Sequence, residues 1–308
     1  MADTPTRGAG PFRGRGLRRR LGTAEAYVAL TVYVFASMFP IGWIFLSSLK
    51  QPADIQTFPP TVVFTPTSYN YEAVLGFITP GERTGGVSGS GATTDRMRFP
   101  RALLNSVVIG LGTTVLALAF GSLAAYALAR MRTRLRGAIL TSILVTRLIP
   151  PIVILVPLYV IWRNLGLLDT HLTLMVTYLT FSLPFAIWMM RGFFMSVPAE
   201  LEDAAQIDGC SRLGALVRVV LPLAAPGLAA TGVFTMMTSW NEFLLATLLT
   251  GAATRTVPPV ILSYISDDAI LWGFLYAAAS IVIVPVLVFS LFVQKYVATG
   301  LTGGAVKG

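Results

Sequence analysis

The residue types that most often carry out chemistry are scarce in this chain. Among its 308 residues, His171 is the single histidine and Cys210 is the single cysteine. A disulfide framework and a metal site built from several His or Cys ligands are therefore excluded. A catalytic triad is unsupported, because there is no second histidine and no Ser or Cys partner near His171. We interpret His171 as a residue that caps a loop, and we expect no metal, no cofactor and no catalytic group.

The lysines argue against a nucleotide site of the P-loop type. Such a loop needs a Gly-Lys pair to hold the phosphates, and none of the three lysines, Lys50, Lys295 and Lys307, follows a glycine. If the chain does work that is driven by a nucleotide, a separate subunit must hydrolyse it.

The low proportion of charged residues indicates that lipid is the main solvent. The chain is 55% hydrophobic and 12% charged, with a mean hydropathy of +0.72, whereas soluble domains carry about 25% charged residues. A helix needs about 20 mostly apolar residues to cross a membrane. Six stretches qualify, near Tyr27–Leu49, Leu103–Leu128, Ala138–Trp162, Leu172–Met190, Leu228–Leu249 and Trp272–Val293. The predicted fold class is all-α, a polytopic membrane protein with six transmembrane helices.

The arginines and lysines predict the orientation of these helices. Most of them fall in the N-terminal tail, in the loop 130–136 and in other segments on the same predicted side. Because cytoplasmic loops carry the excess of positive charge, both termini are predicted to be cytoplasmic. The first stretch is too long for the apolar region of a signal peptide, so we expect it to remain as a span.

The net charge of +9 and the sequence RGRGLRRR at 13–20 are also compatible with an arm that binds nucleic acid. This arm directly precedes a span, so we interpret it as a topology signal that lies near anionic lipid headgroups. The expected partner is membrane lipid and not nucleic acid.

The spans divide the chain into five predicted segments. They are a basic cytoplasmic tail at 1–23, a first transmembrane helix at 24–50, an outer loop with a flexible Gly/Ser-rich tip at 51–101, a five-helix core at 102–297, and a cytoplasmic C-terminal tail at 298–308.

One loop of the core, at 196–226, has the pattern of a short surface helix. Pro198 suits the start of a helix, and the acidic residues that follow suit its first turns. Leu201, Ala204 and Ala205 share a small apolar face, and Gly209 is suited to end the helix. From these residues alone, the helix is either a lid on its own bundle or a docking element for a partner.

This loop resembles the EAA motif of the membrane subunits of ABC importers. The motif is Glu-Ala-Ala, three residues, Gly, nine residues and Ile-x-Leu-Pro. Here Asp203-Ala204-Ala205, Gly209 and Val219-Val220-Leu221-Pro222 keep every spacing. Asp203 replaces the usual Glu and Val219 the usual Ile. The resemblance implies a permease with the MetI-like fold.

Within that family the chain is most similar to the carbohydrate-uptake branch, the maltose-type second permease. The supporting stretches are Leu103-Leu104-Asn105-Ser106, Ala124-Ala125-Tyr126-Ala127, Ile149-Pro150-Pro151, Pro157-Leu158-Tyr159, Ser239-Trp240-Asn241-Glu242-Phe243 and the C-terminal Gly300–Gly308.

The resemblance also implies partners. They are a second homologous permease that completes a heterodimer, two ATP-binding subunits and an extracytoplasmic solute-binding protein, all at the cell membrane of a prokaryote. Residues 198–209 would form the coupling helix that seats in a groove of the ATPase. The coupling residues implied are Glu202, Asp203, Ala204, Ala205, Asp208, Gly209, Leu221 and Pro222.

Two ionisable side chains fall inside predicted spans, where such groups are costly and mark function by default. Arg147 lies about ten residues into the third stretch, and Glu242 lies in the outer half of the fifth, next to Asn241. These residues either form an ion pair or line the path of the solute, for which Asn241 supplies an amide. The alternative is that they only fix helix packing.

Two other classes of membrane protein are alternatives to an importer permease. A secondary transporter driven by an ion gradient should have inverted repeats and several carboxylates near the membrane midplane, and only Glu242 is a candidate. A static membrane anchor would not need kinked spans, whereas Pro150, Pro151 and Pro157 interrupt one of them.

Overall fold

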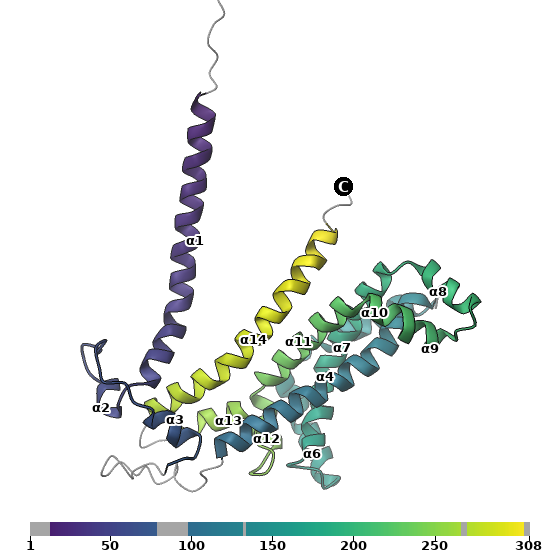
Figure 1. Cartoon of the computed structure of the whole chain (residues 1–308). Helices are drawn as coiled ribbons and strands as arrows, with labels where there is room; N and C mark the ends of the chain where they lie inside the picture. Colours follow the sequence, from purple (N-terminus) through teal and green to yellow (C-terminus); the bar gives the residue numbers. More distant parts are fainter. Residues whose placement is uncertain (1–12, 79–97, 132–133, 266–269, 305–308) are drawn as a thin grey trace, which may run out of the picture.

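A computed structural model describes residues 13–78, 98–131, 134–265 and 270–304, and within these ranges the chain is helical with a single isolated β-bridge, Ile265 to Ile270. Figure 1 shows the order of the elements. The first are α1 (Arg13–Ser48), α2 (Pro52–Ile55), α3 (Tyr69–Val74), α4 (Arg98–Arg130), α5 (Arg136–Thr146), α6 (Pro151–Asn164) and α7 (His171–Ser196). They are followed by α8 (Ala199–Ile207), α9 (Arg212–Ala215), a π-helical turn (Leu216–Val220), α10 (Leu221–Leu223), α11 (Ala225–Trp240), α12 (Leu244–Leu249), α13 (Val257–Leu262) and α14 (Trp272–Gly304).

Four helices are long and apolar enough to cross a membrane: Glu25–Ser48 of α1, all of α4, all of α7, and Trp272–Leu291 of α14. Two bent pairs raise the number to six if each pair is one span: α5 with α6, and the 212–223 helices with α11. The all-α class is therefore confirmed for the described residues. The predicted number of six spans is reached when both bent pairs are counted.

The third predicted stretch is not a straight helix, because α5 and α6 meet at an angle of 89°. The residue before a proline is disfavoured in the α conformation, and here Pro150 has an extended backbone while Pro151 starts α6. Arg147, expected inside a continuous span, therefore lies at the C-terminal end of α5, where the chain turns.

The centre of the molecule is a group of three helices, α4, α7 and α11, which approach one another closely through small residues. A Cβ atom added to Gly121 of α4 would lie 3.0 Å from the Cβ of Ala186 on α7, and one added to Gly110 would meet Met236 of α11. Small residues let helix backbones approach in lipid, where packing replaces the hydrophobic driving force.

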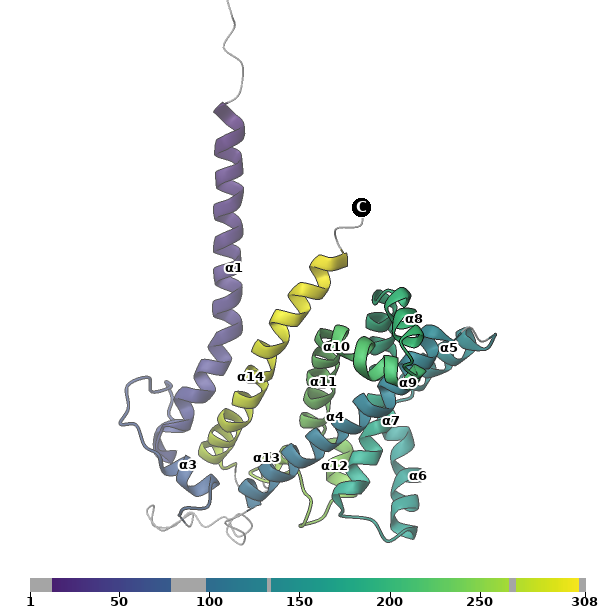
Figure 2. The same ribbon diagram turned by 45° about the vertical axis from the view of Figure 1, so that its right-hand side comes forward.

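α1 and α14 lie to one side of this group, and both views show α1 largely apart from the other helices (Figures 1 and 2). The side chains of Tyr33 and Phe35 on α1 are about 70% exposed. The start of α1 and the end of α14 lie at the same end of the molecule as α8 (Figure 1). The opposite end carries α3, α13 and the start of α4.

Candidate functional site

The loop at 196–226 begins with the helix that the sequence predicted. Pro198 has an extended backbone and is the N-cap of α8, one position before its expected place in the first turn. Gly209 follows the C-cap with φ of +92°, a conformation that glycine adopts without steric cost. The Ser211 hydroxyl then accepts a hydrogen bond from the Gly214 amide at 3.1 Å and starts α9.

The two faces of α8 differ in exposure. Asp203, Ala204 and Asp208 are exposed, and Ile207 is 86% exposed although it is a large apolar residue. Glu202, by contrast, is only 4% exposed. Residues one apart on a helix point about 100° apart, so the neighbouring acids Glu202 and Asp203 face different surroundings. Ala205 lies between the two faces and is half-buried.

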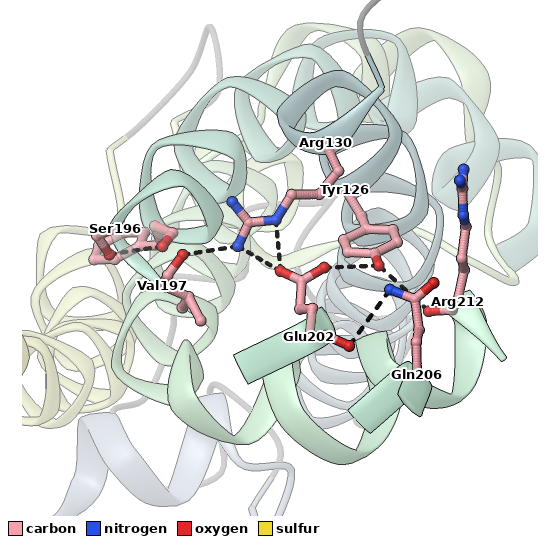
Figure 3. A network of polar contacts seen from close by, with 8 residues as sticks. Tyr126, Arg130, Ser196, Val197, Glu202, Gln206 and Arg212 are labelled. Carbon is pink, nitrogen blue, oxygen red and sulfur yellow. Dashed lines mark hydrogen bonds and ion pairs between the residues drawn. The ribbon is translucent and has the colours of Figure 1, made fainter. Parts of the chain in front are cut away.

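Glu202 is held by two side chains of α4 (Figure 3). The Arg130 guanidinium donates from Nε to Oε1 of Glu202 at 2.5 Å, and its second amino group forms an ion pair with the same oxygen. The Tyr126 hydroxyl donates to Oε2 at 2.9 Å. Because Tyr126 and Arg130 are four residues apart, they lie on one face of α4. Both oxygens of the buried carboxylate therefore have a partner from one neighbouring helix.

Arg130 also reaches the end of α7. Its Nη2 atom donates to the carbonyl of Val197 at 2.8 Å, and Val197 is the C-cap of α7. The Tyr126 ring meets the Phe194 ring edge-on, with centroids 6.4 Å apart. We call Tyr126, Arg130 and Glu202 the α4–α8 latch. This latch joins α4, the end of α7 and α8 at one point.

The remainder of the loop returns to the helix bundle by apolar packing. Leu216, Val220 and Ala224 are buried in one cluster with Met190 and Phe194 of α7. Leu221 is half-buried and Pro222 is exposed. The 212–223 helices then meet α11 at an angle of 81°.

The structure thus separates the coupling residues that were inferred from the motif. Asp203, Ala204, Asp208 and Gly209 lie on the surface, whereas Glu202 is turned inward. Tyr126 and Arg130 were not predicted as site residues. A buried acid in a short helix requires a cation, but the loop at 130–136 offers several arginines, and the sequence does not select one.

The polar residues expected in the fifth span lie where that span is broken. α11 ends at Trp240 and α12 begins at Leu244, so Asn241 and Glu242 occupy the junction. Glu242 accepts hydrogen bonds from the amides of Leu245 and Ala246, at 2.9 and 3.0 Å, and from the Tyr178 hydroxyl at 3.0 Å. Its carboxylate therefore caps α12, where the positive end of the helix dipole favours an anion.

Arg147 and Asn241 are both exposed and have other partners than Glu242. The Arg147 guanidinium lies over the Phe185 ring, 5.2 Å from its centroid. Phe185 in turn stacks on Phe234 of α11, with centroids 4.0 Å apart. The Asn241 amide donates to the Met237 carbonyl at 2.8 Å. Among the described residues, Arg147 and Glu242 do not form the ion pair that was one of the two alternatives.

A second polar group lies at the opposite end of α4. The Asn105 amide donates to the carbonyls of Ala253 and Arg255, both at 3.0 Å, and its oxygen is 2.8 Å from Nε2 of His171. The Ser106 hydroxyl accepts from the Val257 amide at 2.9 Å. These contacts fix the segment 253–257 to the start of α4.

Asp169 holds the same segment from the turn before α7. Its carboxylate accepts from the amides of Ala253 and Thr254 at 3.1 and 2.9 Å, and from the Thr254 hydroxyl at 2.7 Å. Burial raises the pKa of Asp169, but these hydrogen bonds outweigh it, and the pKa lies below the ordinary value.

Comparison with known proteins gives a consistent result. Residues 117–303 match the family described as the binding-protein-dependent transport system inner membrane component. The sulfoquinovosyl glycerol transport system permease of Agrobacterium fabrum is 36% identical, over 96% of this chain and 95% of the relative. The trehalose transport system permease of Mycobacterium tuberculosis is 34% identical, over 90% of this chain and 95% of the relative.

A solved structure has the same fold. It is a chain of a bacterial ABC transporter involved in the import of the acidic polysaccharide alginate. The TM-score is 0.71 at 24% identity, and the match covers 93% of this chain and 99% of the other. From the family match and these relatives, the chain belongs to the binding-protein-dependent transport system inner membrane components, and it is a multi-pass membrane permease of an ABC importer rather than an enzyme.

Proposed function

We propose that this permease carries a sugar or sugar-like solute into a prokaryotic cell, and that residues 198–209 dock on a separate ATP-binding subunit. The observation that carries the proposal is the outward face of α8. This face exposes Asp203, Ala204 and Ile207, while the opposite face is fixed to α4 through Glu202. A helix held on one side and exposed on the other is suited to docking, not to closing over its own bundle.

The chemistry of this face suits a protein partner. The small side chain of Ala204 allows a close approach, and the exposed Ile207 offers an apolar contact between two acids, Asp203 and Asp208. The acids would favour a basic rim on the partner.

The sugar class rests on the two relatives, which are named for transport of sulfoquinovosyl glycerol and trehalose. For the path of the solute we propose Arg147 and Asn241, because both are exposed at breaks between helices. An exposed guanidinium at membrane depth would be costly against lipid, and a watery path or a protein partner would remove that cost. Glu242 contributes to this path indirectly, because its carboxylate caps the start of α12.

We further propose the assembly in which the permease works. It pairs with a second homologous permease, two ATP-binding subunits bind at the α8 end, and a solute-binding protein meets the opposite end. Both termini are then cytoplasmic, including the tail at 298–308, because the ends of α1 and α14 lie on the α8 side (Figure 1). The exposed apolar faces of α1 and α4 leave surface for the second permease.

The test is the variant Asp203→Lys in the tagged full-length chain, expressed with the genes of its partner subunits. Reversal of this exposed charge should leave the amount of folded permease unchanged and abolish copurification of the ATP-binding subunit. The matched control is Glu25→Lys, the same charge change at an exposed position of α1, which should copurify the ATP-binding subunit as the native chain does. A folded Asp203→Lys variant that retains the ATP-binding subunit would refute the docking assignment.

A further inference from the structure

We infer that the α4–α8 latch makes α8 and α4 move as one body, so that a displacement of α8 by the ATP-binding subunit is delivered along α4 to the opposite side of the membrane. Tyr126 and Arg130 are then positioning residues for transport, although neither belongs to the motif. The inference rests on the proposed docking of α8.

The contacts of Glu202 with α4 fix how α8 is oriented on that helix. Glu202 is 4% exposed and both of its oxygens are bound by α4 side chains, at 2.5 and 2.9 Å. A buried carboxylate that loses one partner is left with an unmet charge. Sliding or rotation of α8 relative to α4 would break these contacts, whereas apolar packing alone would tolerate small shifts. The latch therefore fixes the orientation of α8 as well as its position.

α4 is a long helix with no proline in its interior. The helix has 33 residues and is about 50 Å long at 1.5 Å per residue. Its one proline, Pro100, lies in the first turn, where proline does not interrupt helical hydrogen bonds. α1, α7 and α14 each contain an internal proline. α4 is thus the span best suited to transmit a movement without bending.

At its other end, α4 holds the segment that leads into α13. Asn105 binds the carbonyls of Ala253 and Arg255, and Ser106 binds the amide of Val257. The segment 253–257 leads into α13 on the side where we place the solute-binding protein (Figure 1). One rigid helix therefore connects the docking surface on one side to a clamped segment on the other. Coupling between distant sites is carried by such contiguous packed elements.

The latch also contacts the end of α7. Arg130 also binds the Val197 carbonyl, and Val197 connects α7 to α8 through Pro198. Arg130 of α4 thus contacts α8 at Glu202 and the end of α7 at Val197, and the chain itself connects these two points through Pro198. Separation of α8 from α4 would have to break the contacts of Glu202 with both Tyr126 and Arg130, while the contact of Arg130 with Val197 keeps the guanidinium in place.

The experiment measures whether α8 and α4 keep their separation when nucleotide binds. The complete importer is purified in lipid nanodiscs, with Cys210 replaced by Ser and spin labels at Ala199→Cys on α8 and Leu123→Cys on α4, both exposed positions. The distance between the labels is measured without nucleotide and with Mg²⁺ and a non-hydrolysable ATP analogue. When the latch is native, the distance between the two labels should be the same without nucleotide and with the ATP analogue.

The variant pair is Arg130→Met with Glu202→Met. Removing both charges together leaves no unmet buried charge and replaces the ion pair by packing, which proteins commonly tolerate. This double variant should still bind the ATP-binding subunit, but its label distance should change with nucleotide. In the single variant Arg130→Met, the label distance should also change with nucleotide. The control is Arg136→Met, which removes the arginine at the start of α5, a residue that does not contact Glu202, and it should keep the native behaviour.

Two results would overturn the inference. One is a native distance that changes with nucleotide, because α8 and α4 would then not move together. The other is a double variant whose distance stays fixed, because apolar packing would then suffice. Failure of the docking proposal is recognised separately, because Asp203→Lys would retain the ATP-binding subunit whatever the label distances show.

Discussion

Glu202 and Asp203 show how the surroundings decide the role of a side chain. Both are acids in the same short helix, yet Glu202 is enclosed by Tyr126 and Arg130 while Asp203 faces outward. The family resemblance assigns both to the contact with the ATPase, because it follows the order of residues along the chain and contains no information about helix faces. Helical spacing predicts that the two residues diverge. It does not predict which one turns inward, since that depends on where α4 passes.

Asp169 gives a prediction at the scale of one residue. Its pKa in the folded protein lies below the ordinary value of 3.8, so the charged form stabilises the folded state. This contribution is complete above the unfolded pKa, and it is lost as the pH falls through the lower folded pKa. Proteolysis at 250–257, followed by mass spectrometry, should therefore increase as the pH falls below about 4.

The variant Asp169→Asn supplies the control for this titration. It keeps the size of the side chain but has no charge to lose, so its proteolysis at 250–257 should already be raised at neutral pH and should change less on acidification. Equal acid dependence in the native chain and the variant would mean that Asp169 does not hold this segment.

At the scale of the elements, apolar length predicted where the helices lie, and the straight spans agree well with the sequence. α4, α7 and α14 each contain one predicted stretch, and α1 covers the first predicted stretch up to its last residue, Leu49. The third and fifth stretches were correctly predicted to be apolar, but they are bent or broken. The periodicity of apolar residues does not show where a helix changes direction. The bend between α5 and α6 depends on Pro150 and Pro151, and from the sequence we predicted only a kink there.

The break between α11 and α12 was not predicted. Hydropathy continues across it, and the one local signal was the polar pair Asn241 and Glu242, which we interpreted as groups inside a span. In the structure Glu242 caps α12. An acid followed by an apolar run can mark the start of a helix as well as a charge buried within one. The sequence does not distinguish these two possibilities, because the distinction depends on tertiary contacts such as the one with Tyr178.

Gly209 gives a prediction at this scale. Its φ of +92° lies in the left-handed region, and a Cβ atom added there would meet nothing within 4 Å beyond its chain neighbours, so a substitution has a conformational cost but no packing clash. Gly209→Ala should lower the free energy of unfolding by about 1 kcal/mol, measured by chemical denaturation in detergent. Gly209→Pro cannot adopt this φ at all, and it should abolish copurification of the ATP-binding subunit.

A second glycine, Gly192, provides the control for this prediction. It also has open space around its Cβ position, but its φ is not in the left-handed region, so Gly192→Ala should be neutral or slightly stabilising in α7. If Gly209→Ala were as stable as Gly192→Ala, the turn after α8 would not depend on glycine.

At the scale of the whole molecule, the isolated chain leaves much apolar surface uncovered. None of the apolar window of α1 is buried within the chain, compared with about a third of that of α4. Lipid covers such surface in a membrane, but lipid does not satisfy Arg147, which is exposed beside Phe185. This arrangement is explained if a second permease faces the bent pair of α5 and α6 across a watery path.

The measurement that tests the central claim most directly is purification of the tagged native chain from its own membrane under mild conditions, with native mass spectrometry of the intact particle. We predict one copy of this chain, one copy of a second multi-pass permease and two copies of an ATP-binding subunit. A chain that purifies alone or as a homodimer, and that transports solute in liposomes under an ion gradient without ATP, would contradict the account.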